Sequence, residues 1–142
     1  MPRKLRATIL LVWGALLVAL GVLHLAVTPI IGRLLRRSMS AEAADWLAAP
    51  MLLNHVFVGI LLLPLGALVA FAAPHAADGA RWAVVVVRVT AAAVATLPVV
   101  LFVLMGARYF EAVPFVVATA IVCIASVVML AAAFWPAPHA GR

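Results

Sequence analysis

Two histidines, His24 and His55, are the leading candidates for a functional site in this sequence, because each lies in a long apolar stretch. A neutral imidazole can accept a proton, bind a metal ion or serve as an axial ligand of haem. Asn54 precedes His55 in "LLNHVFVG", and a second polar group stands in "RYFEAV". The candidate ligand-binding residues are therefore His24, Asn54, His55, Arg108, Tyr109 and Glu111.

The composition indicates which solvent surrounds these residues. Hydrophobic residues make up 69% of the chain and charged residues 10%, whereas about a quarter of a soluble domain is charged. Four apolar runs, residues 7–31, 47–73, 82–107 and 112–135, each reach the roughly 20 residues that a helix needs to cross a bilayer. The runs are apolar all round, unlike the alternating strands of a membrane barrel. We predict an all-α integral membrane protein, a four-helix antiparallel bundle in which residues 1–142 form a single transmembrane domain.

The spacing of small residues predicts how the first two helices face each other. Residues three, four or seven apart share one face of a helix, and glycines on such a face let two membrane helices approach closely. One stripe lies on the first helix and comprises Gly14, Gly21, His24 and Thr28. The other lies on the second helix and comprises His55, Gly59 and Gly66. Two antiparallel helices bring both histidines to a similar depth, so we expect the imidazoles to meet inside the bundle.

Basic residues predict the orientation in the membrane. The segment "MPRKLR" precedes the first apolar run, and with the N-terminus inside, five or six basic residues lie inside against four outside. Basic residues favour the cytoplasmic side. We therefore expect a multi-pass protein of the plasma (inner) membrane with both termini cytoplasmic, which places the histidines in the outer half of the membrane. Nucleic acid is not an expected partner, because the chain has no soluble basic domain.

Residues 32–46, "GRLLRRSMSAEAADW", form the longest predicted connection. Arg33, Arg36 and Arg37 are spaced as on one side of a helix, a pattern that favours a short interfacial helix; a solvated linker is the alternative. The net charge of +6 indicates anionic lipid head groups as neighbours. We predict that these three arginines contact lipid head groups.

Three features lie inside the predicted helices. Pro64 and Pro98 each remove a helix hydrogen bond and are expected to kink their helices. Arg88 lies within reach of the inner membrane surface, so we expect its side chain to extend to the head groups. Cys123 is the sole cysteine, so no disulfide can form within the chain.

Three interpretations of the polar residues remain open. In the first, His24 is structural and hydrogen-bonds to a carbonyl or to Asn54, while Arg108 pairs with Glu111. In the second, His24 and His55 bind haem or a metal ion, with Glu111 as a possible third metal ligand. In the third, the residues line a pocket for a small or lipid-like molecule, whose anionic group Arg108 would hold.

The chain carries no HExxH motif, no glycine-rich phosphate loop and no serine nucleophile elbow, which argues against a conventional hydrolase. We expect a small membrane protein whose outer-leaflet polar cavity, around His24 and His55, binds a small ligand, a lipid-like molecule, haem or a metal ion. The rival hypothesis is a non-catalytic accessory or structural subunit of a larger membrane complex, or a homo-oligomer. Alanine and glycine on several helix faces would suit such contacts.

Overall fold

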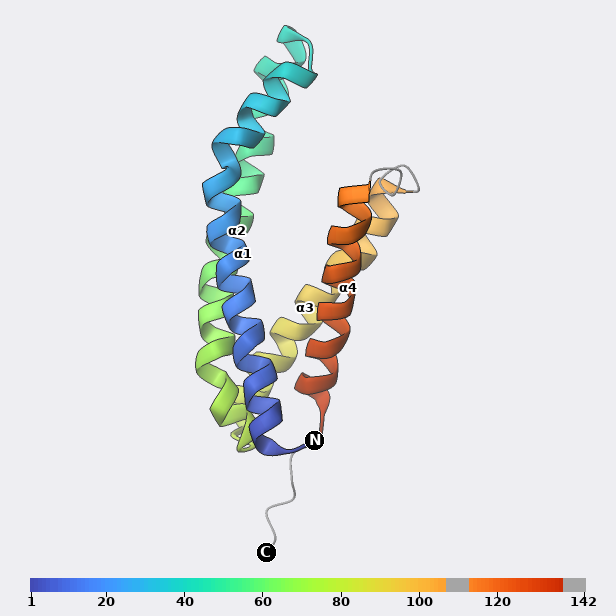
Figure 1. The fold of residues 1–142 in the computed structure, drawn as a ribbon. Helices are drawn as coiled ribbons and strands as arrows, with labels where there is room; N and C mark the ends of the chain where they lie inside the picture. The colour runs from blue at the N-terminus through green and yellow to red at the C-terminus, as the bar shows by residue number, and fades with distance from the viewer. Residues whose placement is uncertain (107–112, 137–142) are drawn as a thin grey trace, which may run out of the picture. The chain divides into compact units, whose positions relative to one another are not determined.

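The computed structural model describes residues 1–106 and 113–136 of the chain. These residues form four helices and no strand: α1 (Arg3–Ser38), α2 (Ala41–Ala77), α3 (Arg81–Met105) and α4 (Val113–Phe134) (Figure 1). In this part of the chain α1, α2 and α3 are long and apolar enough to cross a membrane. The predicted all-α, four-helix membrane fold is confirmed.

The first two helices are longer than predicted. We expected them at residues 7–31 and 47–73, with a separate interfacial segment at 32–46, but α1 continues to Ser38 and α2 begins at Ala41. Residues 33–38 contain no proline and are rich in leucine and arginine, which favour helix. Ser40 then caps the start of α2, because its Oγ accepts a hydrogen bond of 3.3 Å from the Ala43 amide, as an N-cap residue does. Residues 32–38 are thus the last two turns of α1 and form neither a separate short helix nor a linker.

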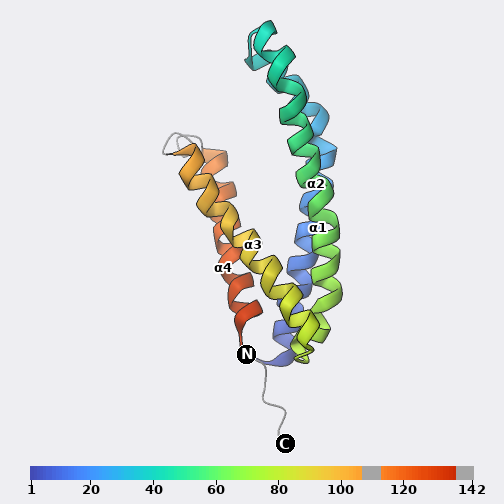
Figure 2. The same cartoon turned by 180° about the vertical axis from the view of Figure 1, so that it is seen from behind.

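The chain divides into two compact units, and residues 14–68 form the first of them. Here α1 and α2 run antiparallel side by side (Figures 1 and 2), and glycines line their contact. A Cβ atom added to Gly21 would lie 2.9 Å from the carbonyl oxygen of Gly59. Because real Cβ atoms do not approach so closely, only glycine permits this packing. The two glycine-lined faces predicted from the sequence are confirmed.

The second unit comprises residues 1–13 together with the described residues from Val69 onward. In this unit α3 and α4 pack against each other. Most of its fully buried side chains are small, which allows helices to approach closely. The buried alanines are Ala72, Ala73, Ala76, Ala77, Ala83, Ala91, Ala132 and Ala133.

A tight turn joins α2 to α3. Gly79 adopts a φ of 82°, a conformation that glycine reaches without a steric penalty. The amide of Ala80 donates to the carbonyl of His75, which satisfies one of the free carbonyls at the end of α2. Arg3 forms an ion pair with Asp78 beside this turn.

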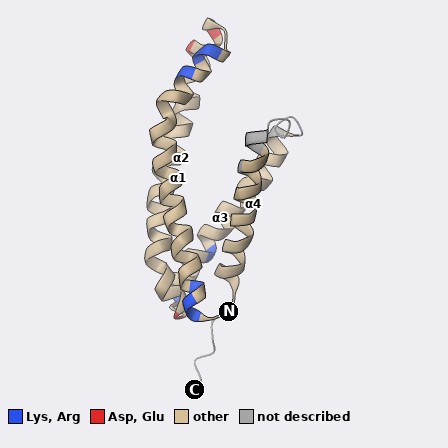
Figure 3. Cartoon of the chain, viewed as in Figure 1, with Lys and Arg blue, Asp and Glu red and all other residues tan. Residues whose placement is uncertain are grey.

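Charged residues gather at the two ends of the α1–α2 hairpin, and its middle carries none (Figure 3).

Three helices contain an internal proline. Pro29 lies inside α1 and Pro98 lies inside α3; Pro64 lies inside α2. All three helices continue through these residues, so the kinks expected at Pro64 and Pro98 stay a prediction. At 36 and 37 residues, α1 and α2 are each about 55 Å long, against about 30 Å of hydrocarbon.

Candidate functional site at the α1–α2 hairpin

The imidazole rings of His24 and His55 lie against each other, with their centres 4.7 Å apart and their planes inclined by 32°. Both side chains are half-buried. The predicted meeting of these two histidines between α1 and α2 is therefore confirmed. Their spacing follows from the glycines, because Gly21 and Gly59 bring the two backbones together one turn away from the rings.

His24 takes part in two hydrogen bonds within α1. Its Nδ1 lies 3.0 Å from the carbonyl oxygen of Leu20. Because a carbonyl oxygen only accepts hydrogen bonds, Nδ1 is the donor in this contact. Thr28 Oγ1 donates to the carbonyl of His24 at 2.8 Å. This carbonyl contact agrees with one element of the structural interpretation.

His55 differs from His24 because its Nε2 is buried without a hydrogen-bond partner. A buried polar atom without a partner costs free energy, about 1–3 kcal/mol. Asn54 supplies no such partner, because it is exposed and neighbouring residues point about 100° apart around a helix. The structure therefore joins the two histidines and leaves Asn54 outside their contact.

The ring positions bear on the haem hypothesis. Two imidazoles on opposite sides of one metal ion place their ring centres about 6 Å apart, since each metal–nitrogen bond is about 2 Å. The 4.7 Å between His24 and His55 is too short for that arrangement. Within residues 1–106 and 113–136, no group of three His, Cys, Asp or Glu side chains is placed to hold a metal ion.

Three candidate residues, Arg108, Tyr109 and Glu111, lie outside the described residues. The predicted pairing of Arg108 with Glu111, the predicted binding of an anionic group by Arg108 and the predicted metal ligand Glu111 stay predictions.

A cavity of about 330 Å³ lies about one helical turn from the histidine pair, between α1 and α2. We call it the Thr28 cavity, and its lining residues are Thr28, Pro29, Gly32, Arg33, Arg36 and Leu52. Thr28 follows His24 by four residues, and Leu52 precedes His55 by three, so each is about one helical turn from its histidine. The cavity and the histidine pair thus form one continuous stretch of the hairpin.

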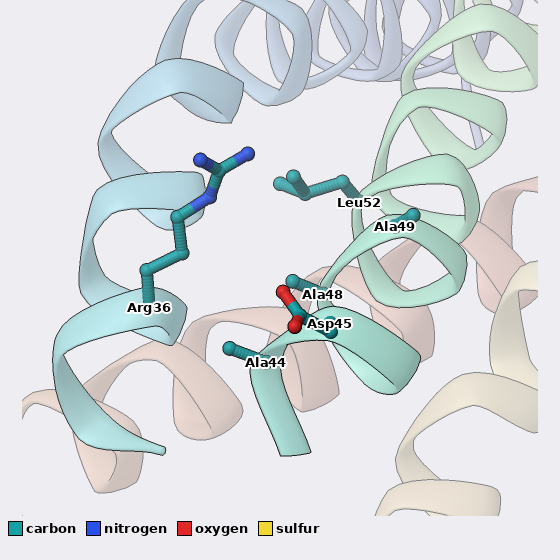
Figure 4. Close-up of a pocket in the computed structure, with 6 residues that line it drawn as sticks. All are labelled: Arg36, Ala44, Asp45, Ala48, Ala49 and Leu52. Atoms are coloured by element: carbon teal, nitrogen blue, oxygen red, sulfur yellow. The ribbon is translucent and has the colours of Figure 1, made fainter. Parts of the chain in front are cut away.

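A second cavity, of about 270 Å³, lies at the end of the hairpin (Figure 4). We call it the Asp45 cavity, and its lining residues are Arg36, Ala44, Asp45, Ala48, Ala49 and Leu52. Arg36 and Leu52 line both cavities. Arg37 lines neither, so the structure separates three arginines that the sequence had grouped together. Ala44 and Ala48, one helical turn apart, are the signal in the sequence that could have indicated a hollow here.

The depth of these residues follows from the apolar stretches. If about 30 Å of hydrocarbon is centred on residues 7–31 of α1, it ends about 10 residues from the centre, near residue 29. Arg33 and Arg36 then lie about 6 and 10 Å beyond it. The same estimate for residues 47–73 of α2 places Asp45 about 8 Å beyond it and His55 about 8 Å inside, level with His24. On this estimate the charged cavity walls fall at the level of the lipid head groups.

The sequence did not reveal Arg6 as a buried residue, because "MPRKLR" has the form of an exposed basic segment. Arg6 is only 2% exposed. Its Nε donates to the carbonyl of Ala132 at 3.0 Å, and its Nη2 donates to the carbonyl of Ala133 at 3.2 Å. These carbonyls lie in the last turn of α4, where backbone acceptors have no partner within the helix. Arg6 therefore caps the C-terminus of α4.

Arg88 also binds the end of α4. Its Nε donates to the carbonyl of Ala133 at 3.3 Å, and its guanidinium carbon lies 5.2 Å from the centre of the Phe134 ring. This contact replaces the extension to the head groups that we predicted for Arg88. A positive charge at a helix C-terminus is stabilised by the helix dipole, so Arg88 needs no acidic partner.

Composition, helix lengths and the four-helix fold define a helical membrane protein. No protein family, curated protein or solved structure compared with this chain matches it. The basis for a function is therefore the chemistry of the hairpin.

Proposed function

We propose that this protein binds the head groups of membrane lipids at the end of the α1–α2 hairpin. The observation that carries the proposal is that Arg36 lines both the Thr28 cavity and the Asp45 cavity. Among the described residues, the one ion pair joins Arg3 and Asp78. The guanidinium group of Arg36 is therefore not neutralised by a salt bridge and can bind a phosphate.

The chemistry of the cavity walls supports a phosphate-bearing amphiphile. A guanidinium group donates two parallel hydrogen bonds to a phosphate, and Arg33 adds a second positive charge to the Thr28 cavity. Leu52 lines both cavities from α2, on their hydrocarbon side by the depth estimate above. A lipid offers this combination, with a charged group at the surface and apolar carbons below it.

In this proposal the histidine pair positions the hairpin. His24 and His55 stack about one helical turn below the Thr28 cavity, where Gly21 and Gly59 hold the backbones close. Because the two helices are held in place, the cavity walls do not have to become ordered each time a lipid binds. Such preorganisation lowers the free-energy cost of binding and increases affinity.

The proposal includes an orientation in which both termini are cytoplasmic, in the plasma (inner) membrane. Arg3 and Lys4 at the start of α1 support it through the preference of basic residues for the cytoplasmic side. The two cavities then open in the outer leaflet.

The test compares Arg36→Gln with Arg37→Gln, two adjacent residues that each lose one positive charge. The purified variants are incubated with phosphatidylglycerol, and bound lipid is counted by native mass spectrometry. We expect Arg36→Gln to lower lipid affinity about tenfold, because a hydrogen bond to a charged group contributes about 1.5–3 kcal/mol. Arg37→Gln should change it little. Equal losses would indicate general attraction between charges and would overturn the proposal, as would unchanged binding in both variants.

A further inference from the structure

Arg36 and Asp45 face the same cavity from different helices (Figure 4). Arg36 extends from α1, and Asp45 extends from α2, four residues after its first residue. No salt bridge joins them, since the pair Arg3–Asp78 is the one found among residues 1–106 and 113–136. The hairpin thus holds one positive and one negative side chain apart across a hollow.

The remaining walls of the Asp45 cavity are small and apolar. Ala44, Ala48, Ala49 and Leu52 complete the lining, and none of these side chains offers a hydrogen bond. The polar groups of a ligand must therefore meet Arg36 and Asp45. A ligand with only negative charge would gain from Arg36 but would be repelled by Asp45, whereas a ligand with both charges would be attracted by both residues.

We infer that the Asp45 cavity selects a zwitterionic lipid head group with a primary amine, of the phosphoethanolamine class. Its phosphate binds Arg36, and its ammonium group donates hydrogen bonds to the Asp45 carboxylate. This inference rests on the proposed function and names the class of lipid that the hairpin binds. The two side chains carry no net charge together, so a head group of no net charge leaves the site neutral.

Size and depth agree with a head group as the occupant. Cavities for whole small molecules span about 300–1,000 Å³, and the Asp45 cavity measures about 270 Å³. It is therefore near the lower end of this range and suits a small group such as a lipid head group. Both charged walls lie about 8–10 Å beyond the hydrocarbon edge by helix rise, which is the level of the head groups.

The experiment measures the preference between two lipids. Wild-type protein, Asp45→Asn and Glu42→Gln are each incubated with equal amounts of phosphatidylethanolamine and phosphatidylglycerol of the same acyl chains, and bound lipids are counted by native mass spectrometry. Glu42 is exposed, lies on the same helix end and lines no part of the cavity, so its variant is a control for the loss of one negative charge. We expect the wild type and Glu42→Gln to prefer phosphatidylethanolamine about tenfold, and Asp45→Asn to lose that preference.

Two further measurements keep the outcome clear. Asp45→Glu retains the carboxylate and should retain the preference, which separates loss of charge from misfolding. Phosphatidylcholine, whose ammonium group has no N–H, should bind more weakly than phosphatidylethanolamine. Equal binding of these two lipids would overturn the assignment of a primary amine.

The inference and the proposed function can fail separately. If Arg36→Gln weakens lipid binding while Asp45→Asn leaves the ratio of the two lipids unchanged, the head-group class is overturned and lipid binding at Arg36 stands. If Arg36→Gln and Arg37→Gln behave alike, both are overturned.

Discussion

Gly66 of α2 packs directly against the backbone of Gly14 on α1, so that a Cβ atom added to Gly66 would lie 2.6 Å from the Gly14 carbonyl oxygen. The same atom would lie 2.7 Å from the backbone nitrogen of Val18. Backbone atoms on a neighbouring helix cannot give way as the end of a side chain can. The contact therefore fixes the separation of α1 and α2 in residues 14–68.

The first prediction is that Gly66→Ala destabilises the hairpin. Overpacking of a close contact costs about 1–3 kcal/mol, which exceeds the gain of up to about 1 kcal/mol in helix propensity. Thermal unfolding of the protein in mild detergent, followed by circular dichroism, should show a lower midpoint. Gly32→Ala is the control, because its Cβ would meet only the flexible Leu52 side chain, at 3.3 Å. Equal destabilisation by both variants would contradict this account.

The second prediction concerns the partnerless nitrogen of His55. His55→Phe keeps an aromatic ring against His24 and removes the buried polar atom, so its unfolding temperature should equal or exceed that of the wild type. His55→Ala loses the ring contact and should unfold at a lower temperature. A strong loss of stability in His55→Phe would show that Nε2 has a partner in the membrane.

The third prediction is that purified protein shows no Soret band that depends on both histidines. The 4.7 Å between the ring centres of His24 and His55 is shorter than the roughly 6 Å that separates two imidazoles bound on opposite sides of a haem iron. The measurement is a visible absorption spectrum of protein expressed with added haem. A Soret band that disappears in His24→Ala and in His55→Ala alike would contradict the prediction.

The fourth prediction is that Arg6→Gln loosens α4. The substitution removes the charged donors that bind the carbonyls of Ala132 and Ala133, and each such bond contributes about 1.5–3 kcal/mol. Cys123 is half-buried on α4 and reports the change, because it should react faster with a thiol reagent. Lys4→Gln removes an exposed charge and should leave the rate unchanged; equal rates in the two variants would refute the capping role.

The fifth prediction is the orientation. After Cys123→Ser, single cysteines are placed at Ser40, between α1 and α2, and at Ala80, before α3. An impermeant maleimide should label Ser40→Cys in intact cells and Ala80→Cys only after the membrane is opened. The reverse labelling pattern would place both termini outside the cell and Ser40, at the end of the hairpin, inside it.

The sequence predicted the histidine contact because the information was periodic. Steps of three and four residues place Gly21 on the same helix face as His24 and Gly59 on the same face as His55. Because glycines allow two membrane helices to approach closely, these two faces were expected to meet. The depth match followed from helix rise alone. No detail of side-chain packing was needed for either inference.

The capping role of Arg6 could not be predicted from the sequence, because it depends on where the distant helix α4 ends. Arg6 binds carbonyls 126 and 127 residues away in the chain, and every residue has a carbonyl, so no residue type marks these partners. The continuation of α1 to Ser38 was missed for a local reason. The arginines of residues 32–38 suggested an interfacial segment, although nothing there breaks a helix. The Asp45 cavity became visible only once α1 was long enough to place Arg36 opposite Asp45.

The apolar stretch of α1, residues 7–31, is 25 residues and about 38 Å long, whereas an average hydrocarbon core is about 30 Å thick. Such a hydrophobic mismatch is relieved when a helix tilts or when the bilayer thickens around it. Because the glycine contacts tie α2 to α1, the two helices must tilt together. Bilayer thickness would then set the height of Arg36 and Asp45 above the lipid phosphates. The thickness of the surrounding membrane thus becomes a variable that can tune head-group binding.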